Sequence, residues 1–195
     1  MCSKSHEARK ASTQLLSIYA CAIELSTDGQ AHLIFDLIRW CNYAELDQLD
    51  SIIRNLLTHE ITHLLIGHRY PAADAALEST DYLRRLDAYT FHEGFAHLLS
   101  YQATEIDCVD WHTPQLTEVA AASRAKLRLA LTETDPDRQK QFLEEAVCGS
   151  YYEKFACMCG MLYLADRWET QGIDGLQSAF ADYHGFAQRA LSIRI

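Results

Sequence analysis

The residues best suited to chemistry in this 195-residue chain are His59, Glu60 and His63, which form a His-Glu-x-x-His pattern. Residues i and i+4 of an α-helix project from one face, about one turn apart, so two imidazoles at this spacing can bind one metal ion. Imidazole nitrogens are typical ligands of tetrahedral Zn²⁺, and the glutamate can take a proton from a metal-bound water. The pattern predicts that His59 and His63 bind Zn²⁺ and that Glu60 is the general base.

The segment that carries this pattern, residues 45–68, has a helical period. Its apolar side chains recur at steps of three and four and form one stripe with the two histidines, which comprises Leu49, Ile52, Leu56, His59 and His63. Both imidazoles are therefore expected to point inward. The alternative is a pair of hydrogen-bonded core histidines beside an exposed glutamate.

A zinc enzyme needs a third protein ligand and one open position, and the best candidate is Glu93. It lies 29 residues past His63 on a second predicted helix, residues 80–102, which is enough chain to turn and run back alongside the first. Glu93 shares a helical stripe with apolar residues, and Gly94 would let the two helices approach closely. The alternative is a solvated acid on the helix surface.

The two segments together resemble the gluzincin clan of zinc metallopeptidases. Some aminopeptidases of that clan carry an Asn-Glu-Gly-Phe-Ala run, and this chain has Glu-Gly-Phe-Ala at residues 93–96. The resemblance covers residues 59–97 and implies that His59, His63 and Glu93 bind zinc while Glu60 acts as the base. It also implies a strand, around residues 32–37, that binds an extended substrate over the cleft.

The chain departs from that family around Glu93. The spacing from His63 is longer than in the best-known members, and His97 stands where some of them have an aspartate that orients the first ligand histidine. His97 could orient a ligand from behind, or it could bind the metal itself. His92 should project about 100° away from Glu93 and is expected to support the site or face the substrate; the alternative is an ordinary core or surface histidine.

Two tyrosines are candidates for stabilising the oxyanion that forms during hydrolysis. Tyr151 and Tyr152 open a predicted helix over residues 151–168, which also carries small residues suited to tight packing, Ala156 and Gly160. The alternative is that both tyrosines are ordinary half-buried aromatics.

The remaining pattern predicts an α+β fold that is mainly α. Alternating residues over 17–40, with Asp28 and Gly29 as the turn, predict a β-hairpin ahead of the first helix, although a helix over residues 8–24 is the alternative. Residues 70–74 are expected to form a loop. Helical periods recur over residues 116–131, 137–147, 151–170 and 173–190. We therefore expect a single zincin-like domain spanning residues 1–195, with a helical C-terminal half.

The amino-acid composition and net charge limit the classes of partner that this protein can bind. Hydrophobic residues make up 49% and charged residues 23% of the chain, which excludes a disordered protein. The net charge of −10 argues against nucleic acid as a partner. No apolar run reaches the roughly 18 residues of a membrane span, and no secretory start is visible, so we expect no membrane partner and a cytoplasmic location with reduced cysteines.

The interpretation that these observations favour is a zinc metallopeptidase acting on a peptide or protein substrate. One alternative is a non-catalytic zinc-binding protein whose site is closed by His97 as a fourth ligand. A helical di-iron carboxylate protein is another, since Glu60 and His63 satisfy its Glu-x-x-His pattern once. That fold needs a second such pair, and the sequences after Glu93, Glu105 and Glu118 do not supply one.

Overall fold

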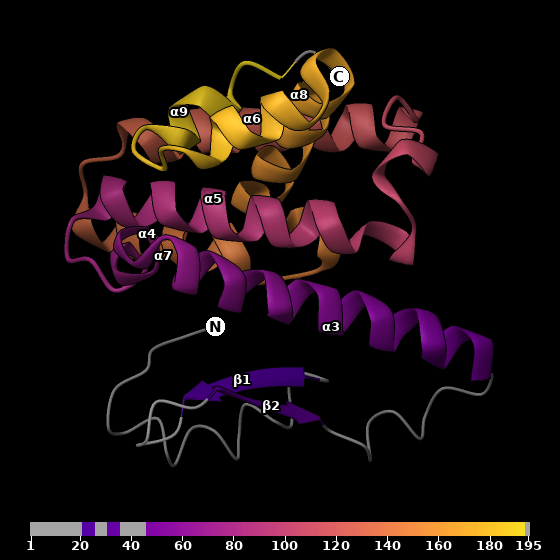
Figure 1. Cartoon of the computed structure of the whole chain (residues 1–195). Helices are drawn as coiled ribbons and strands as arrows, with labels where there is room; N and C mark the ends of the chain where they lie inside the picture. Colours follow the sequence, from indigo (N-terminus) through magenta and orange to yellow (C-terminus); the bar gives the residue numbers. More distant parts are fainter. Residues whose placement is uncertain (1–20, 26–30, 36–45, 194–195) are drawn as a thin grey trace.

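The computed structural model describes residues 21–25, 31–35 and 46–193, and helices form most of that part (Figure 1). The α-helices are α3 Leu46–Arg69, α4 Pro71–Ala76, α5 Tyr82–Ser100, α6 Pro114–Thr132, α7 Pro136–Val147, α8 Phe155–Phe180 and α9 Phe186–Ala190. Short 3-10 turns are η1 Tyr101–Ala103, η2 Ile106–Cys108 and η3 Tyr151–Glu153. Among these described helices, none combines the length and the apolar character needed to cross a membrane.

The predicted α+β class is wrong, because the described fold is all-α in its architecture. The strands β1 Cys21–Leu25 and β2 Ala31–Phe35 pair antiparallel, with Cys21 opposite Phe35, and within the described ranges they form a ribbon of two strands and no larger sheet. Alternation over two such short segments can specify a ribbon, but a ribbon alone buries too little to organise a domain. In the described residues, a body of packed helices therefore takes the place of the zincin-like sheet that was expected before the first helix.

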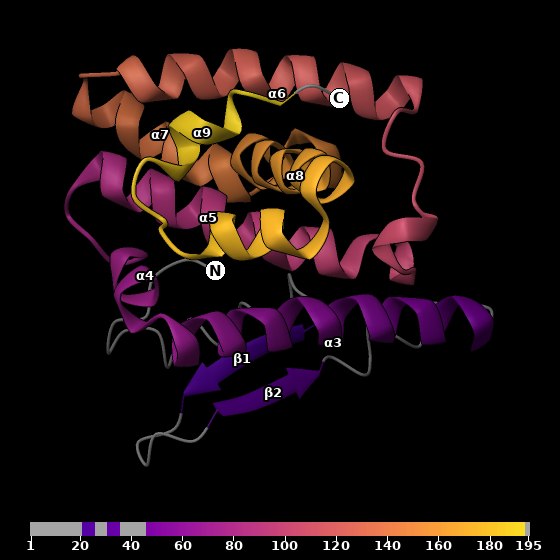
Figure 2. The same ribbon diagram turned by 45° about the horizontal axis from the view of Figure 1, so that its top comes forward.

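Helix α5 lies at the centre of that body. It packs against α3 on one side and against α8 on the other, while α3 lies between α5 and the two strands (Figures 1 and 2). The first and second helices of the sequence prediction are thus neighbours in space, as the 29-residue connection allowed. The side chains of α3 and α5 that face each other form the candidate site.

Most helices lie where the sequence predicts them, and the differences have local causes. Residues 70–74, predicted as a loop, instead lead into α4, since Pro71 has the backbone angle of a first helical residue. Asp135 caps α7 by accepting a hydrogen bond from the Arg138 amide. Gly172, which lies between the predicted helical segments 151–170 and 173–190, has φ 59° and kinks α8, which continues beyond it.

An aromatic cluster forms the core beneath the middle of α5. Phe91 and Phe95 on α5 lie 5.1 Å apart between ring centroids, and Phe91 contacts the fully buried Phe186 of α9 at 5.2 Å. Tyr70, Phe180 and Tyr183 complete the cluster. The aromatic packing therefore ties the C-terminal segment to the helix that carries Glu93.

Asp87 holds the last helix against α5. Its carboxylate accepts hydrogen bonds from the backbone amides of Gly185 at 2.7 Å and Ala187 at 2.9 Å, at the N-terminus of α9. We expect Asp87→Ala to lower the free energy of unfolding by about 1–2 kcal/mol, the usual effect of losing such a cap. Urea unfolding followed by circular dichroism measures the change. The exposed Glu118, replaced by Ala, is the control, and equal midpoints for both variants would contradict this role.

Candidate metal centre

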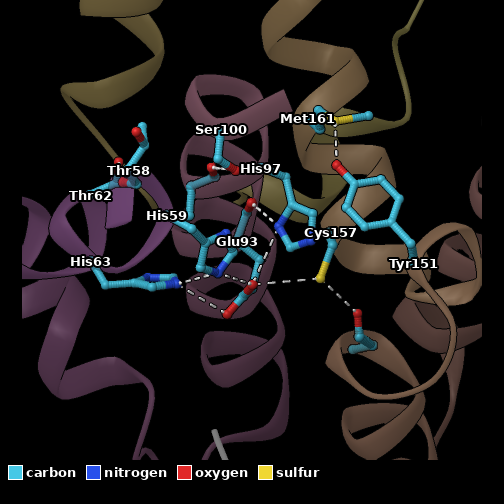
Figure 3. A network of polar contacts seen from close by, with 12 residues as sticks. Thr58, His59, Thr62, His63, Glu93, His97, Ser100, Tyr151, Cys157 and Met161 are labelled. Carbon is cyan, nitrogen blue, oxygen red and sulfur yellow. Dashed lines mark hydrogen bonds and ion pairs between the residues drawn. The ribbon is translucent and has the colours of Figure 1, made fainter. Parts of the chain in front are cut away.

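Three predicted ligands, carried by α3 and α5, meet at one point. The Nε2 atoms of His59 and His63 lie 3.1 Å apart; His59 Nε2 lies 3.5 Å from the Oε2 atom of Glu93, and His63 Nε2 lies 3.5 Å from its Oε1 atom (Figure 3). His59 and His63 occupy the same face of α3 one turn apart, as the i, i+4 spacing predicts. Glu93 reaches them from the facing side of α5.

These distances suit a tetrahedral zinc ion. Zn–N and Zn–O bonds of about 2.0–2.2 Å in tetrahedral geometry place neighbouring ligand atoms about 3.3–3.6 Å apart. The two nitrogens are slightly closer, at 3.1 Å, and each lies 3.5 Å from a different oxygen of Glu93. Two nitrogens and one oxygen are also a donor set that zinc accepts, so the residues fit the metal.

The protonation states fit as well. Burial lowers the pKa of His63 to about 3 and that of His97 to about 4, and it also lowers the pKa of His59. Burial alone would raise the pKa of Glu93, but the neighbouring His63 and His59 outweigh it and hold that pKa below its ordinary value. Near neutral pH the imidazoles are therefore neutral and the carboxylate is ionised, the forms in which these groups bind metals.

The charge on Glu93 favours a cation at this point. Its side chain is 15% exposed, and among the described residues no lysine or arginine forms an ion pair with it; its ionic contacts there are His59, His63 and His97. A buried carboxylate surrounded by neutral rings is costly unless a positive charge compensates it. A divalent cation held by the same three side chains would supply that charge.

His97 lies on the other side of Glu93, one turn further along α5. Its Nδ1 is 2.9 Å from the backbone oxygen of Glu93, and because a carbonyl oxygen only accepts, this nitrogen carries the proton. His97 is buried and its ring meets that of His59 edge to face at 4.8 Å. Potential ligand atoms of His59, Glu93 and His97 also lie within 4.8 Å of one another, so a second ligand set is possible there.

His92 is buried rather than open to a substrate. Its ring stacks on that of His63 with centroids 5.9 Å apart, and it is 1% exposed. Neither ring nitrogen has a hydrogen-bond partner among the described residues. The structure thus places His92 behind His63, where it can limit the tilt of that ring, and not in contact with solvent.

The two candidate tyrosines lie outside the cluster of ligands. Both belong to the 3-10 turn η3, and α8 begins only at Phe155. The prediction that they open the long helix is therefore wrong. The Tyr151 ring lies 5.3 Å from that of His97, but its hydroxyl points to the Met161 sulfur, away from Glu93 (Figure 3). The Tyr152 hydroxyl lies 3.3 Å from that of Tyr101.

Glu60, the predicted general base, has a side chain that is 9% exposed. It follows His59 on α3, so it projects about 100° around the helix from that ligand. Glu60 is therefore not the solvated glutamate of the alternative, although His59 and His63 do lie within hydrogen-bond distance of each other.

Cys157 is a neighbour of the site that the sequence did not indicate. Its thiol lies 3.8 Å from the Oε2 atom of Glu93 and 3.4 Å from the backbone oxygen of Ala146, on the side of the carboxylate away from His63 (Figure 3). Burial raises the pKa of this thiol, so it keeps its proton and can donate to one of the two oxygens. Cys157 is fully buried, and no spacing in the sequence relates it to Glu93.

The position of Glu93 also depends on a contact between glycines. A methyl group added at Gly94 would lie 2.8 Å from the Gly160 backbone, and one added at Gly160 would lie 2.2 Å from the Thr90 carbonyl oxygen. Gly94 therefore permits close approach to α8 and not, as predicted, to the helix that carries the histidines. The small residues predicted for tight packing in α8 meet α5 here.

We expect Cys157→Ala to weaken zinc binding by about 10-fold or more, because a ligand carboxylate loses a neighbour that orients it. Equilibrium competition with a chromophoric chelator measures the affinity. Cys159→Ala is the matched control, since Cys159 is equally buried on the same helix. Cys157→Ser should retain most of the affinity by keeping the donor. Equal affinities for the two alanine variants would show that Cys157 does not position Glu93.

Comparison with known proteins identifies no relative of this chain. No protein-family model matches the chain, and neither a curated protein nor a solved structure matches it. The functional conclusion therefore depends on the chemistry of the site.

Proposed function

We propose that this protein is a zinc-dependent peptidase that hydrolyses peptide bonds. The observation that carries the proposal is the convergence of His59, His63 and Glu93: the two imidazole nitrogens lie 3.1 Å apart and each lies 3.5 Å from a carboxylate oxygen of Glu93, separations close to those between the ligands of a tetrahedral zinc ion. The sequence resemblance to gluzincins over residues 59–97 supports hydrolysis as the reaction and a peptide as the substrate.

Zinc bound there would act as a Lewis acid on the substrate carbonyl and lower the pKa of a water molecule at the open position. In this proposal Glu60 accepts the proton of the attacking water and returns it to the leaving amine. His59, His63 and Glu93 hold the ion. His97 orients the backbone of Glu93 through its Nδ1 proton, and Cys157 orients the carboxylate.

A closed, non-catalytic zinc site is the second candidate. It is favoured by the position of His97, which is 3% exposed and has a ligand atom within 4.8 Å of those of His59 and Glu93. A fourth protein ligand would leave no position for water. The Nδ1 proton of His97 is committed to a carbonyl oxygen, so only its Nε2 atom could serve.

Reconstitution separates these candidates. The chain is freed of metal, loaded with zinc, and assayed against a library of internally quenched peptides, with metal content measured on the same sample. We expect about one zinc per chain, hydrolysis that depends on it, and binding of acetohydroxamic acid. One zinc per chain without hydrolysis or hydroxamate binding would instead identify a closed site, and two irons per chain would identify a di-iron protein.

We also propose that the protein works in the cytoplasm. Three cysteines of the described residues, Cys108, Cys157 and Cys159, form no disulfide, as expected in a reducing compartment. A thiol beside a zinc ligand also needs such conditions, because oxidation of Cys157 would disturb Glu93. Fractionation of the cells that express the protein tests the location.

A further inference from the structure

A hollow of about 540 Å³ adjoins the candidate metal centre. It lies between the first half of α3 and the chain that follows α5. Its lining includes Asn55, Thr58, Leu98, Leu99, Ile106 and Trp168. This volume is in the range of ligand sites in proteins and is ample for one or two amino-acid residues.

The hollow is one helical turn from the ligands. Asn55 precedes His59 by four residues on α3, so the amide shares a face with both ligand histidines, about 6 Å along the helix from the nearer one. On the opposite wall, Leu98 directly follows His97. Both walls of the hollow therefore continue directly into the helical turns that carry His59 and His97.

Asn55 has an unused hydrogen-bond acceptor. Its Oδ1 atom is buried and has no partner among the described residues. A buried acceptor without a donor costs stability, and the terminal torsion of asparagine turns easily. An N–H group of a ligand in the hollow would satisfy it, and the backbone of a peptide supplies such groups.

The lining of the hollow combines apolar and acidic side chains. Leu99, which is 47% exposed, and Ile106 provide apolar contact. Glu105 and Asp107, on either side of Ile106 in the sequence, supply negative charge, and Trp168 donates to Asp107 at 2.7 Å. Asp107 also lines a second hollow of about 520 Å³ beyond Trp168.

Arg54 also lines the hollow, and its guanidinium is paired with Asp50 at 2.9 Å. Two carboxylates, Glu105 and Asp107, thus face one cation that is already paired, and the hollow is suited to a positive side chain.

We propose that this hollow selects the peptide substrate and that it takes an apolar residue together with a neighbouring basic one. The inference rests on the proposed function, because it places those residues on one side of the bond to be cleaved. Leu99 and Ile106 contact the apolar side chain, Asn55 accepts a backbone N–H, and Glu105 attracts the basic side chain.

Peptide binding to the zinc-loaded Glu60→Gln variant tests the proposal without cleavage. Three fluorescein-labelled octapeptides carry Leu-Lys, Leu-Glu or Ser-Lys at the centre of the same Gly/Ala background, and anisotropy gives each Kd. We expect Leu-Lys to bind about five-fold tighter than Leu-Glu, in the range of one exposed charge pair, with the preference shrinking at high salt. Leu-Lys should also bind more tightly than Ser-Lys.

Second substitutions in the same background assign the contacts. Glu105→Lys should remove or reverse the preference for Lys over Glu, while Glu118→Lys, the same charge change on exposed α6, should leave it intact. Leu99→Ser should remove the preference for Leu over Ser, and Asn55→Ala should weaken all three peptides. If Glu105→Lys changes the preference for Lys over Glu no more than Glu118→Lys does, the proposal is wrong.

A small chelating probe separates this proposal from the one on which it depends. Acetohydroxamic acid is too short to use the hollow, so it should bind the zinc-loaded protein equally in every one of these variants. If it binds while the peptides show no preference, the hollow is not the specificity site and the zinc site stands. If neither zinc nor the hydroxamate binds, the proposed function fails and this inference fails with it.

Discussion

Replacement of Glu60 by Gln is expected to reduce turnover by a factor of about 10²–10⁴ or more while zinc content stays at the parent level. Gln has nearly the shape of Glu and cannot accept a proton, so the variant keeps the packing of this buried position and loses the base. The measurement is kcat for the best peptide of the library, with zinc determined on the same preparation.

The control for that change is Glu118→Gln, which removes one negative charge from the exposed face of α6 and should leave kcat unchanged. Turnover of the Glu60→Gln variant within a few-fold of the parent would show that another group is the base. Loss of zinc from that variant would show instead that Glu60 supports the metal.

Replacement of His63 by Ala should abolish stoichiometric zinc binding. The His63 imidazole is 8% exposed and lies 3.5 Å from Glu93, so its loss removes one of three ligands and leaves a cavity beside a buried carboxylate. Residues that support a ligand without binding the metal contribute roughly 10–100-fold to the affinity, and we expect the loss of His63 to cost more than that. Competition with a chromophoric chelator measures the Kd.

A thermal shift provides a second readout for this variant. Zinc at 100 times its Kd stabilises a protein by about 2.7 kcal/mol, so added zinc should raise the Tm of the parent and not that of the variant. His68→Ala, which changes an exposed histidine on the same helix, should behave like the parent. Full zinc retention after His63→Ala would refute the assignment of the ligands.

Much of the candidate site could be predicted because its signals are local to helices. The i, i+4 spacing of His59 and His63 fixes their common face, and the apolar stripe around Glu93 indicates that this carboxylate turns inward. Each inference needs only the geometry of one helix. The structure brings these three residues together as the spacing predicted.

The remainder depends on contacts between segments far apart in sequence. Cys157 comes 64 residues after Glu93, and its approach follows from how α8 packs on α5, which no periodicity encodes. The fold class was wrong for a related reason. Alternation over residues 17–40 describes a local preference for extended backbone, whereas the class depends on how much of the core a sheet would build.

Helix α8 supplies none of the three proposed ligands, but the contact between Gly94 and Gly160 makes its packing on α5 important for the metal site. Metal–ligand distances tolerate deviations of about 0.2 Å, much less than the displacement that one extra methyl group between two backbones would require. The spacing between α5 and α8 therefore sets whether Glu93 can meet the two histidines. Sequence changes in α8 that alter this spacing should act as changes in metal affinity, even where the helices remain folded.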